Sequence, residues 1–229
     1  GMGTVAPNPY YTADVAAVCM EKIFLPTIDA MNKEGRTFKG CLYFGLMITA
    51  DGPKVIEYNC RFGDPETQVV LPRMKNDIID VVEACIDGNL DKIDLQFEDN
   101  AAVCVVLASD GYPVKYEKGL EIRGLDNFNG KDGYYCFHAG TKLDNGKFVT
   151  NGGRVLGITA KGADLKEARA KVMELVEAGE NDQALKVFNG EYTEATDQIQ
   201  DILIEIGEYS DGEAVSAYKA GSVTGIIVI

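Results

Sequence analysis

The sequence predicts an α+β protein, and three observations lead to this fold class. Apolar residues recur at helical spacing over 12–33 and again over 77–87. Residues 101–108 form an almost continuous apolar run of a length typical of a buried strand. Two strand patterns between residues 41 and 61 flank the turn sequence Asp51-Gly52-Pro53, and this arrangement predicts an antiparallel hairpin.

Length and composition set the first limits. A chain of 229 residues can bury a substantial core and hold one or two domains. It contains no run of about 20 apolar residues, so no complete membrane span is expected, and no secretory signal opens it. The net charge of −14 argues against general nucleic-acid binding, because that function needs a basic face.

Cysteine use indicates a reducing compartment. The six cysteines are scattered through apolar segments, and none forms a C-x-x-C pair. We therefore expect reduced core residues in a cytoplasmic protein. The single histidine, His138, argues against a histidine-rich metal site.

One helix is expected over 12–33 and another over 77–87, and residues 1–7 before them should form a loop because they contain Gly and Pro. Thr12 is a suitable N-cap for the helix over 12–33, and Pro26 should start a new segment or kink it. The apolar stripe of this helix is Val15, Val18, Cys19, Ile23 and Phe24. The inward residues of the helix over 77–87 are expected to be Ile78, Val81, Val82 and Cys85.

The strand over 54–61 carries the candidate site. With alternating side chains, Val55, Glu57, Asn59 and Arg61 should share one face, spaced by roughly 6.6–6.8 Å. The opposite face holds Ile56, Tyr58, Cys60 and Phe62 and is expected to be core. Glu57 and Asn59 offer oxygen ligands that suit Mg²⁺. The Arg61 guanidinium suits phosphate or carboxylate.

A turn and a helix should follow this strand. Gly63 permits a sharp turn, Asp64 is a candidate N-cap, and Pro65 would occupy the first helical position. The N-terminus of that helix is a candidate anion site. Taken one at a time, each polar residue is more often a solvated side chain or a simple cap, whereas the ordered set is more specific.

The segment from Arg61 to Gln68, RFGDPETQ, resembles the signature of the phosphoribosylamine–glycine ligase family, and Glu57-Tyr58-Asn59 resembles the E-x-N magnesium pair of that family. The resemblance extends from about residue 1 to about 171. It implies the C-terminal portion of an ATP-grasp domain over 1–88, followed by a small α+β C-terminal domain over 89–173.

The resemblance also implies a reaction. Glycine would be joined to 5-phosphoribosylamine with cleavage of ATP, through a glycyl phosphate, in purine synthesis. Mg²⁺ or Mn²⁺ would lie on Glu57 and Asn59, and Arg61 and Asp64 would be catalytic. Substrate contacts would come from Gly3, Arg61, Asp64, Glu66 and Arg154. For Asp64 three roles remain open: orienting Arg61, contacting a substrate amine, or capping the helix.

The resemblance begins inside a glycine-rich loop of the family. Either the product is truncated, or Gly1 is an added residue before Met2. In both cases we expect that this chain lacks the first part of the catalytic domain and is inactive alone. The alternatives are another ATP-grasp carboxylate–amine ligase, or a non-catalytic helical assembly module.

Further strands are expected at 120–123, 134–138, 147–150 and 154–160, followed by a helix over 165–176. The sequence Asp144-Asn145-Gly146-Lys147 predicts a tight hairpin turn. Arg154 follows two glycines, and it is either a surface residue beside a glycine turn or a residue facing the active cleft.

The segment 174–229 is an acidic tail with twelve acidic residues and two lysines, a net charge of −10. Apolar residues recur there at alternating spacings of four and three, which predicts a helix that pairs through a heptad-like seam and supports self-association. The seam comprises Phe188, Tyr192, Ala195, Ile199, Ile202, Ile206 and Tyr209. The tail faintly resembles the helical sensory domain of bacterial chemotaxis receptors. Residues 223–229 fit either a strand or the start of a membrane helix.

Overall fold

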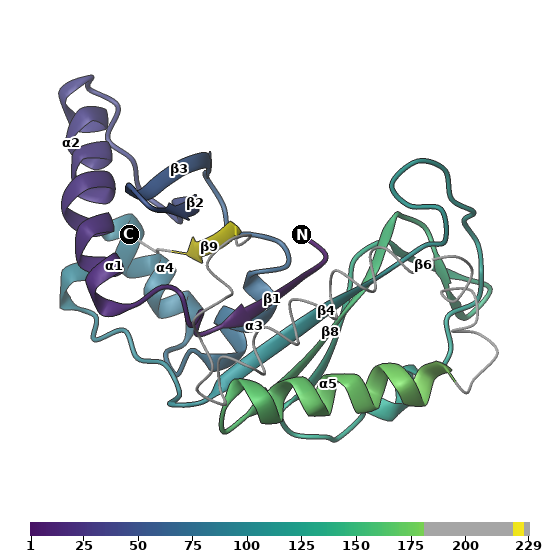
Figure 1. The fold of residues 1–229 in the computed structure, drawn as a ribbon. Helices are drawn as coiled ribbons and strands as arrows, with labels where there is room; N and C mark the ends of the chain where they lie inside the picture. The colour runs from purple at the N-terminus through teal and green to yellow at the C-terminus, as the bar shows by residue number, and fades with distance from the viewer. Residues whose placement is uncertain (181–221, 227–229) are drawn as a thin grey trace. The chain divides into compact units, whose positions relative to one another are not determined.

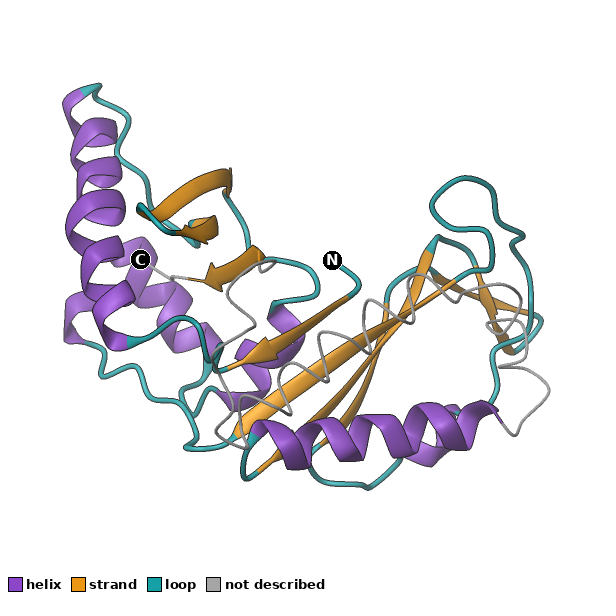
Figure 2. Ribbon diagram, in the orientation of Figure 1, coloured by secondary structure: helices purple, strands orange, loops and turns teal. Residues whose placement is uncertain are grey.

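The computed structural model describes residues 1–180 and 222–226, and the heptad-like seam predicted over 188–209 lies outside them. The described chain contains helices and antiparallel strands, as predicted (Figures 1 and 2). The strands are β1 Gly3–Ala6, β2 Tyr43–Thr49, β3 Gly52–Asn59, β4 Ala101–Ala108, β5 Tyr134–His138, β6 Thr141–Asp144, β7 Lys147–Thr150, β8 Arg154–Gly162 and β9 Ser222–Ile226. The α-helices are α1 Ala13–Cys19, α2 Leu25–Lys33, α3 Thr67–Val70, α4 Ile78–Asp87 and α5 Leu165–Glu180.

The chain divides into two compact units, each with its own sheet. Within the described residues, the first unit comprises 1–6, 64–73 and 99–180, and the second comprises 7–63, 74–98 and 222–226. The first unit holds a four-stranded antiparallel sheet in the order β1-β4-β8-β5, together with the β6-β7 hairpin. The second unit holds a three-stranded sheet in the order β3-β2-β9.

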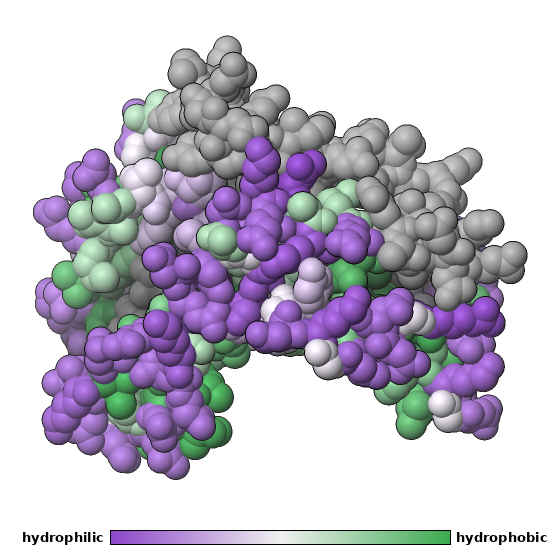
Figure 3. All heavy atoms as spheres, turned by 90° about the horizontal axis from the view of Figure 1, so that it is seen from below, coloured by the Kyte–Doolittle hydropathy of each residue, from purple (hydrophilic) through white to green (hydrophobic). Residues whose placement is uncertain are grey.

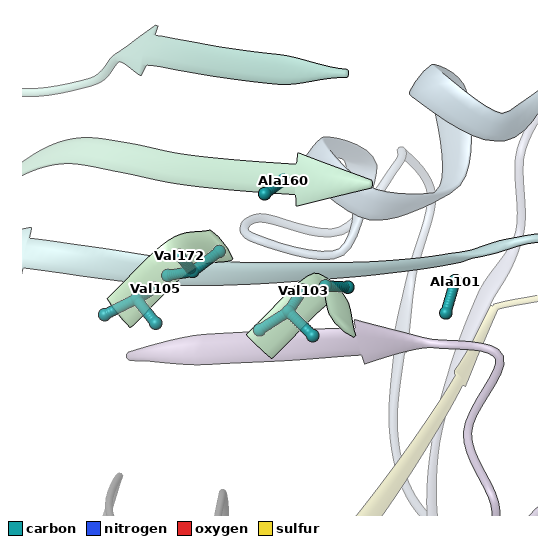
Figure 4. Packing of buried hydrophobic residues seen from close by; sticks show 6 residues of the cluster. Ala101, Val103, Val105, Ala160 and Val172 are labelled. Carbon is teal, nitrogen blue, oxygen red and sulfur yellow. The ribbon is translucent and has the colours of Figure 1, made fainter. Parts of the chain in front are cut away.

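The core of the first unit lies between its four-stranded sheet and α5. Side chains from β4, β8 and α5 gather on one side of the sheet (Figure 4). This cluster consists of Ala101, Val103, Val105, Ala160, Ala168 and Val172. Alternate residues of β4 thus face α5, whereas Ala102 and Cys104 face a second buried group with Ala6 and Val69. Burial on both faces explains why the β4 sequence is almost continuously apolar.

The core of the second unit forms where the first helical segment covers the β2–β3 hairpin. Thr12 caps α1 as predicted, with its Oγ1 accepting a hydrogen bond from the Val15 backbone N–H at 3.3 Å. A π-helical segment, Met20–Phe24, links α1 to α2, and Pro26 lies in the first turn of α2. The Phe24 ring packs on Phe44 of β2 with centroids 4.5 Å apart, and both side chains are buried.

Several local predictions were wrong. The loop predicted over 1–7 contains β1, which pairs with β4. The strand predicted over 120–123 is reduced to a single bridge between Glu121 and Val149. Val82 of α4 does not face inward as expected, since this residue is 43% exposed. The β6–β7 hairpin did form at the predicted turn, with positive φ angles of 47° at Asn145 and 79° at Gly146.

On the face drawn in Figure 3, hydrophilic side chains predominate and hydrophobic residues occur in separate groups. Within the described residues, no helix combines the length and hydropathy needed to cross a bilayer. Residues 222–226 form a strand against β2, which favours the strand interpretation of the last apolar run over a membrane helix.

Candidate functional site

The second unit presents Glu57, Asn59 and Arg61 as a connected group. The Asn59 Nδ2 donates a hydrogen bond to Glu57 Oε1 at 3.2 Å, and Arg61 Nη2 donates to Asn59 Oδ1 at 3.4 Å. Arg61 Nη1 also donates to the Phe62 carbonyl at 2.8 Å. Glu57 and Arg61 are exposed, and Asn59 is partly buried. The carboxylate and the amide therefore lie side by side and within reach of solvent.

A β-bulge sets the direction of these side chains. Glu57 lies opposite Gly45, but the next residue of β2, Leu46, lies opposite Val55, so Ile56 is the extra residue of β3. Val55 consequently points with Leu46 into the core, whereas Glu57 and Asn59 lie on the opposite face. The prediction that Val55 shares a face with Glu57 was therefore wrong.

The predicted core face of this strand also needs correction. Ile56 is 58% exposed and Tyr58 is 50% exposed, and Cys60 is an exposed free thiol. Tyr58 does contact the buried Phe44, with ring centroids 5.2 Å apart. The strand ends at Asn59, so Arg61 lies on the segment that follows it. The side-chain alternation of a strand does not extend to Arg61.

The first unit presents a second polar group around Asp64. Arg154, at the start of β8, donates from Nη2 to Asp64 Oδ2 at 3.0 Å and from Nη1 to the Asp64 carbonyl at 2.9 Å. The same Nη1 donates to the Gly1 carbonyl at 3.1 Å. Gln68 Nε2 donates to Asp64 Oδ1 at 2.9 Å. Three segments that are distant in sequence therefore meet at the Arg154 guanidinium.

Asp64 is not the N-cap that the sequence suggested. Residues 64–66 form a turn, α3 begins at Thr67, and its N-cap is Glu66, whose side chain makes no capping hydrogen bond. The carbonyl of Glu66 instead accepts the backbone N–H groups of Val69 and Val70, each at 3.1 Å. With only four residues, α3 is also too short for the predicted anion site at its N-terminus.

The backbone that carries Arg154 is held by close glycine packing. The Ser109 Oγ donates to the Gly152 carbonyl at 2.7 Å, and the Ser109 N–H donates to the Gly153 carbonyl at 2.7 Å. A Cβ at Gly153 would collide with the ring of Tyr112, so only glycine fits there. This packing fixes the backbone immediately before Arg154.

Gly3 and Cys104 belong to the same unit as the Asp64 turn. Gly3 lies in β1 opposite Val105, and a Cβ there would come within 3.0 Å of the Cys104 carbonyl, so its close backbone approach is to β4. The pKa of the Cys104 thiol is raised to about 11, mainly by burial; a hydrogen bond with Thr159 opposes this increase, and the negative charges of Asp64 and Glu66 contribute to it. Cys104 is therefore protonated at neutral pH and is a poor nucleophile.

The donor set limits what the Glu57 group could bind. Carboxylate and amide oxygens suit Mg²⁺ or Mn²⁺. Within the described part of the chain, no cluster of three or more His, Cys, Asp or Glu side chains is arranged as a metal site. A divalent cation on Glu57 and Asn59 would therefore need further oxygens from phosphate groups or water, which is the usual situation for Mg²⁺ bound with a nucleotide.

Two residues of these groups were missed by sequence reasoning. Gln68 lies four residues after Asp64, and this spacing could have indicated a side-chain contact. Gly45 had no sequence signal, because its partner Glu57 is defined only by the register of the hairpin. The pairing of Asp64 with Arg154, 90 residues apart, likewise had no local signal.

Comparisons with known proteins identify the family. The model of the phosphoribosylglycinamide synthetase ATP-grasp (A) domain matches residues 1–67, and that of the C domain matches residues 102–186. The chain is 50% identical over 169 residues to a phosphoribosylamine–glycine ligase of Caldanaerobacter subterraneus, covering 74% of this chain and 40% of that protein. It is 51% identical to the trifunctional purine biosynthetic protein adenosine-3 of Gallus gallus, covering 73% and 17% respectively.

A solved structure gives the same result. The crystal structure of phosphoribosylamine–glycine ligase from Thermotoga maritima is 37% identical, with a TM-score of 0.64, over 77% of this chain and 43% of that one. The chain thus spans about two fifths of the length of the bacterial ligases it matches. The chain belongs to the phosphoribosylglycinamide synthetase family and carries parts of its ATP-grasp domain and its C domain.

Proposed function

We propose that this chain supplies the residues that bind the metal ion and the phosphate, and part of the substrate site, of a phosphoribosylamine–glycine ligase. The observation that carries the proposal is the hydrogen-bonded series formed by Glu57 and Asn59 of the β2–β3 hairpin and by Arg61 of the segment that follows it. Family membership supports the same reaction, because the relatives in Caldanaerobacter and Thermotoga bear that name. The small-molecule substrates would be ATP, glycine and 5-phosphoribosylamine, in the cytoplasm.

The reaction has two steps. A glycine carboxylate oxygen attacks the γ-phosphorus of ATP, the bond from that phosphorus to the β–γ bridging oxygen breaks, and ADP leaves. The amine of phosphoribosylamine then attacks the carbonyl of the glycyl phosphate, phosphate leaves, and the amine loses a proton. The main difficulty is charge, because a carboxylate must approach a polyphosphate.

The proposed roles follow from the chemistry of each side chain. Glu57 and Asn59 would hold Mg²⁺ or Mn²⁺, which offsets phosphate charge when it is bound. The Arg61 guanidinium would bind the transferring phosphoryl group or the glycine carboxylate through its planar fork. Asp64 and Arg154, paired with each other, would contact the substrates, as would Glu66 and Gly3.

The same proposal sets the domain limits. We place the ATP-grasp part over residues 1–88 and the C-terminal domain over 89–173, with 174–229 as a separate acidic tail. Matches of the two domain models to 1–67 and 102–186 support the first boundary. The second boundary stays a prediction.

Calorimetric titration with Mg²⁺-ADP tests the metal assignment. Glu57→Gln should weaken binding by at least about tenfold, because it removes the charged ligand. The control is Glu83→Gln, which removes an exposed carboxylate from α4 in the same unit and should leave the affinity unchanged. Equal loss in both variants, or no loss in either, contradicts the assignment.

Turnover tests the reaction itself. We expect ADP release with glycine and phosphoribosylamine to be undetectable for this chain alone. It should appear when the chain is mixed with a polypeptide that carries the remaining N-terminal part of the Caldanaerobacter ligase, and Glu57→Gln should abolish it. Turnover that survives Glu57→Gln at the normal rate counts against the proposed site.

A further inference from the structure

The Asp64 carboxylate is held from both sides by side chains of its own unit. Gln68 Nε2 donates to one oxygen, Oδ1, at 2.9 Å. Arg154 Nη2 donates to the other oxygen, Oδ2, at 3.0 Å. We propose that Gln68 and Arg154 are positioning residues that hold Asp64 in one orientation and thereby lock the 64–68 turn. This assignment rests on the proposed ligase function and adds Gln68 to it.

Arg154 binds the backbone as well as the Asp64 side chain. Besides binding the Asp64 carboxylate, Arg154 Nη1 donates to the Asp64 carbonyl at 2.9 Å and to the Gly1 carbonyl at 3.1 Å. A guanidinium that binds three acceptors through two nitrogens fixes both their separation and their plane. Hydrogen bonds from Arg154 therefore connect the start of β8 both to the turn at Asp64 and to the first residue of the chain.

The placement of Gln68 is also specific. Its Cγ lies 3.7 Å from the position that a Cβ would take at Gly157 of β8, so the Gln68 stem passes over a strand position without a side chain. Among the described residues, Gln68 Oε1 is buried without a hydrogen-bond partner. The NH2 group of the Gln68 amide therefore points at Asp64, because an ionised carboxylate accepts hydrogen bonds and cannot donate them.

This arrangement narrows the role of Asp64. Each of its oxygens accepts one charge-assisted or amide hydrogen bond from the chain, and we assign it as a fixed acceptor that orients the turn. Arg61 lies three residues before Asp64. A rigid turn at Asp64 limits the conformations open to the segment that carries Arg61.

We call the arrangement in which Gln68 and Arg154 hold the Asp64 carboxylate the Asp64 clamp. Backbone hydrogen exchange tests this clamp and does not require enzyme activity. The reporters are the N–H groups of Gln68, Val69 and Val70, which bond to Pro65 and Glu66. Gln68→Met keeps the length of the side chain and removes the donor, and it should speed exchange at these amides by about tenfold. The matched control is Gln96→Met, which loses a comparable bond to Asp94 Oδ2 of 2.6 Å and should leave the reporters unchanged.

Arg154 provides the second arm of this experiment. Arg154→Met should also speed exchange at the reporters, and the double variant should be less affected than the product of the two single effects, because both act through Asp64. If Arg154→Met does not fold, Arg154→Lys, which keeps one donor and loses the fork, should give an intermediate effect. The clamp is overturned if the reporter amides exchange at an unchanged rate in Gln68→Met, or if the effects of the two substitutions multiply fully in the double variant.

The kinetic test separates positioning from general stabilisation. In the two-polypeptide turnover assay, Gln68→Met should lower kcat by about tenfold and leave the KM for ATP within about twofold. Gln96→Met should change neither. A normal kcat in Gln68→Met overturns the positioning role. Absence of turnover in the unmodified mixture counts against the proposed function, and hydrogen exchange then decides the clamp by itself.

Discussion

Gly45 and Glu57 lie directly opposite each other on β2 and β3, and the missing side chain of Gly45 makes room for Glu57. A Cβ at Gly45 would come within 2.7 Å of Glu57 Cγ. Because Cγ is close to the backbone and cannot swing away freely, a larger residue would force Glu57 into another rotamer. The direction of the proposed metal ligand is therefore set by a glycine on the neighbouring strand.

Substitution of this glycine should weaken cation binding while the ligands themselves remain. Gly45→Ala is expected to lower Mg²⁺-ADP affinity by about tenfold or more, as is usual when the support of a ligand is disturbed. Calorimetric titration measures the effect. Met47→Ala is the control, since Met47 lies two residues further along β2 and pairs with Lys54. A similar loss in Met47→Ala would show that the hairpin is merely sensitive to substitution.

The ring of Phe44 should be the main source of packing energy in the second unit. It is fully buried and contacts both Phe24 and Tyr58. Phe44→Ala should reduce the free energy of unfolding by about 3–5 kcal/mol, measured by urea denaturation. The same change at Phe148, which is 40% exposed, should cost less than about 1 kcal/mol. Equal losses would contradict this account of the core.

Glu167 should make stability depend on pH at the acidic end. Its carboxylate accepts from Lys171 Nζ at 2.7 Å and from the Ala163 N–H at 2.7 Å, just before α5. The hydrogen bond from Lys171 and then that from Ala163 lower its pKa from the ordinary value of 4.5. Since the folded pKa is lower than the unfolded one, this contribution is fully present above the unfolded pKa and is lost as pH falls through the folded pKa.

Urea denaturation at several pH values measures this effect. Glu167→Gln should be less stable than the unmodified chain at neutral pH, and the difference should shrink as pH falls below about 4.5. Lys171→Met removes the main partner and should show the same convergence at low pH. A difference between the Glu167→Gln variant and the unmodified chain that stays constant down to pH 3 would rule out the linkage.

Local structure was predicted best where a local physical signal exists. The Thr12 cap, the apolar stripe through Cys19 and Phe24, and the hairpin at Asn145-Gly146 all depend on neighbours in the sequence, and they formed as expected. The strand at residues 3–6 was missed because its stability comes from pairing with β4. Short strands of this kind carry little propensity of their own.

For the candidate site, the sequence alone determined which chemical groups are available: a carboxylate at Glu57, an amide at Asn59 and a guanidinium at Arg61, close together along the chain. Tertiary structure decided their setting. The bulge at Ile56 turned Val55 into the core and left Glu57 on the other face, and the sheet brought Arg154 to Asp64 across 90 residues. Both outcomes depend on strand register, which is set by packing between distant segments and is absent from any local pattern.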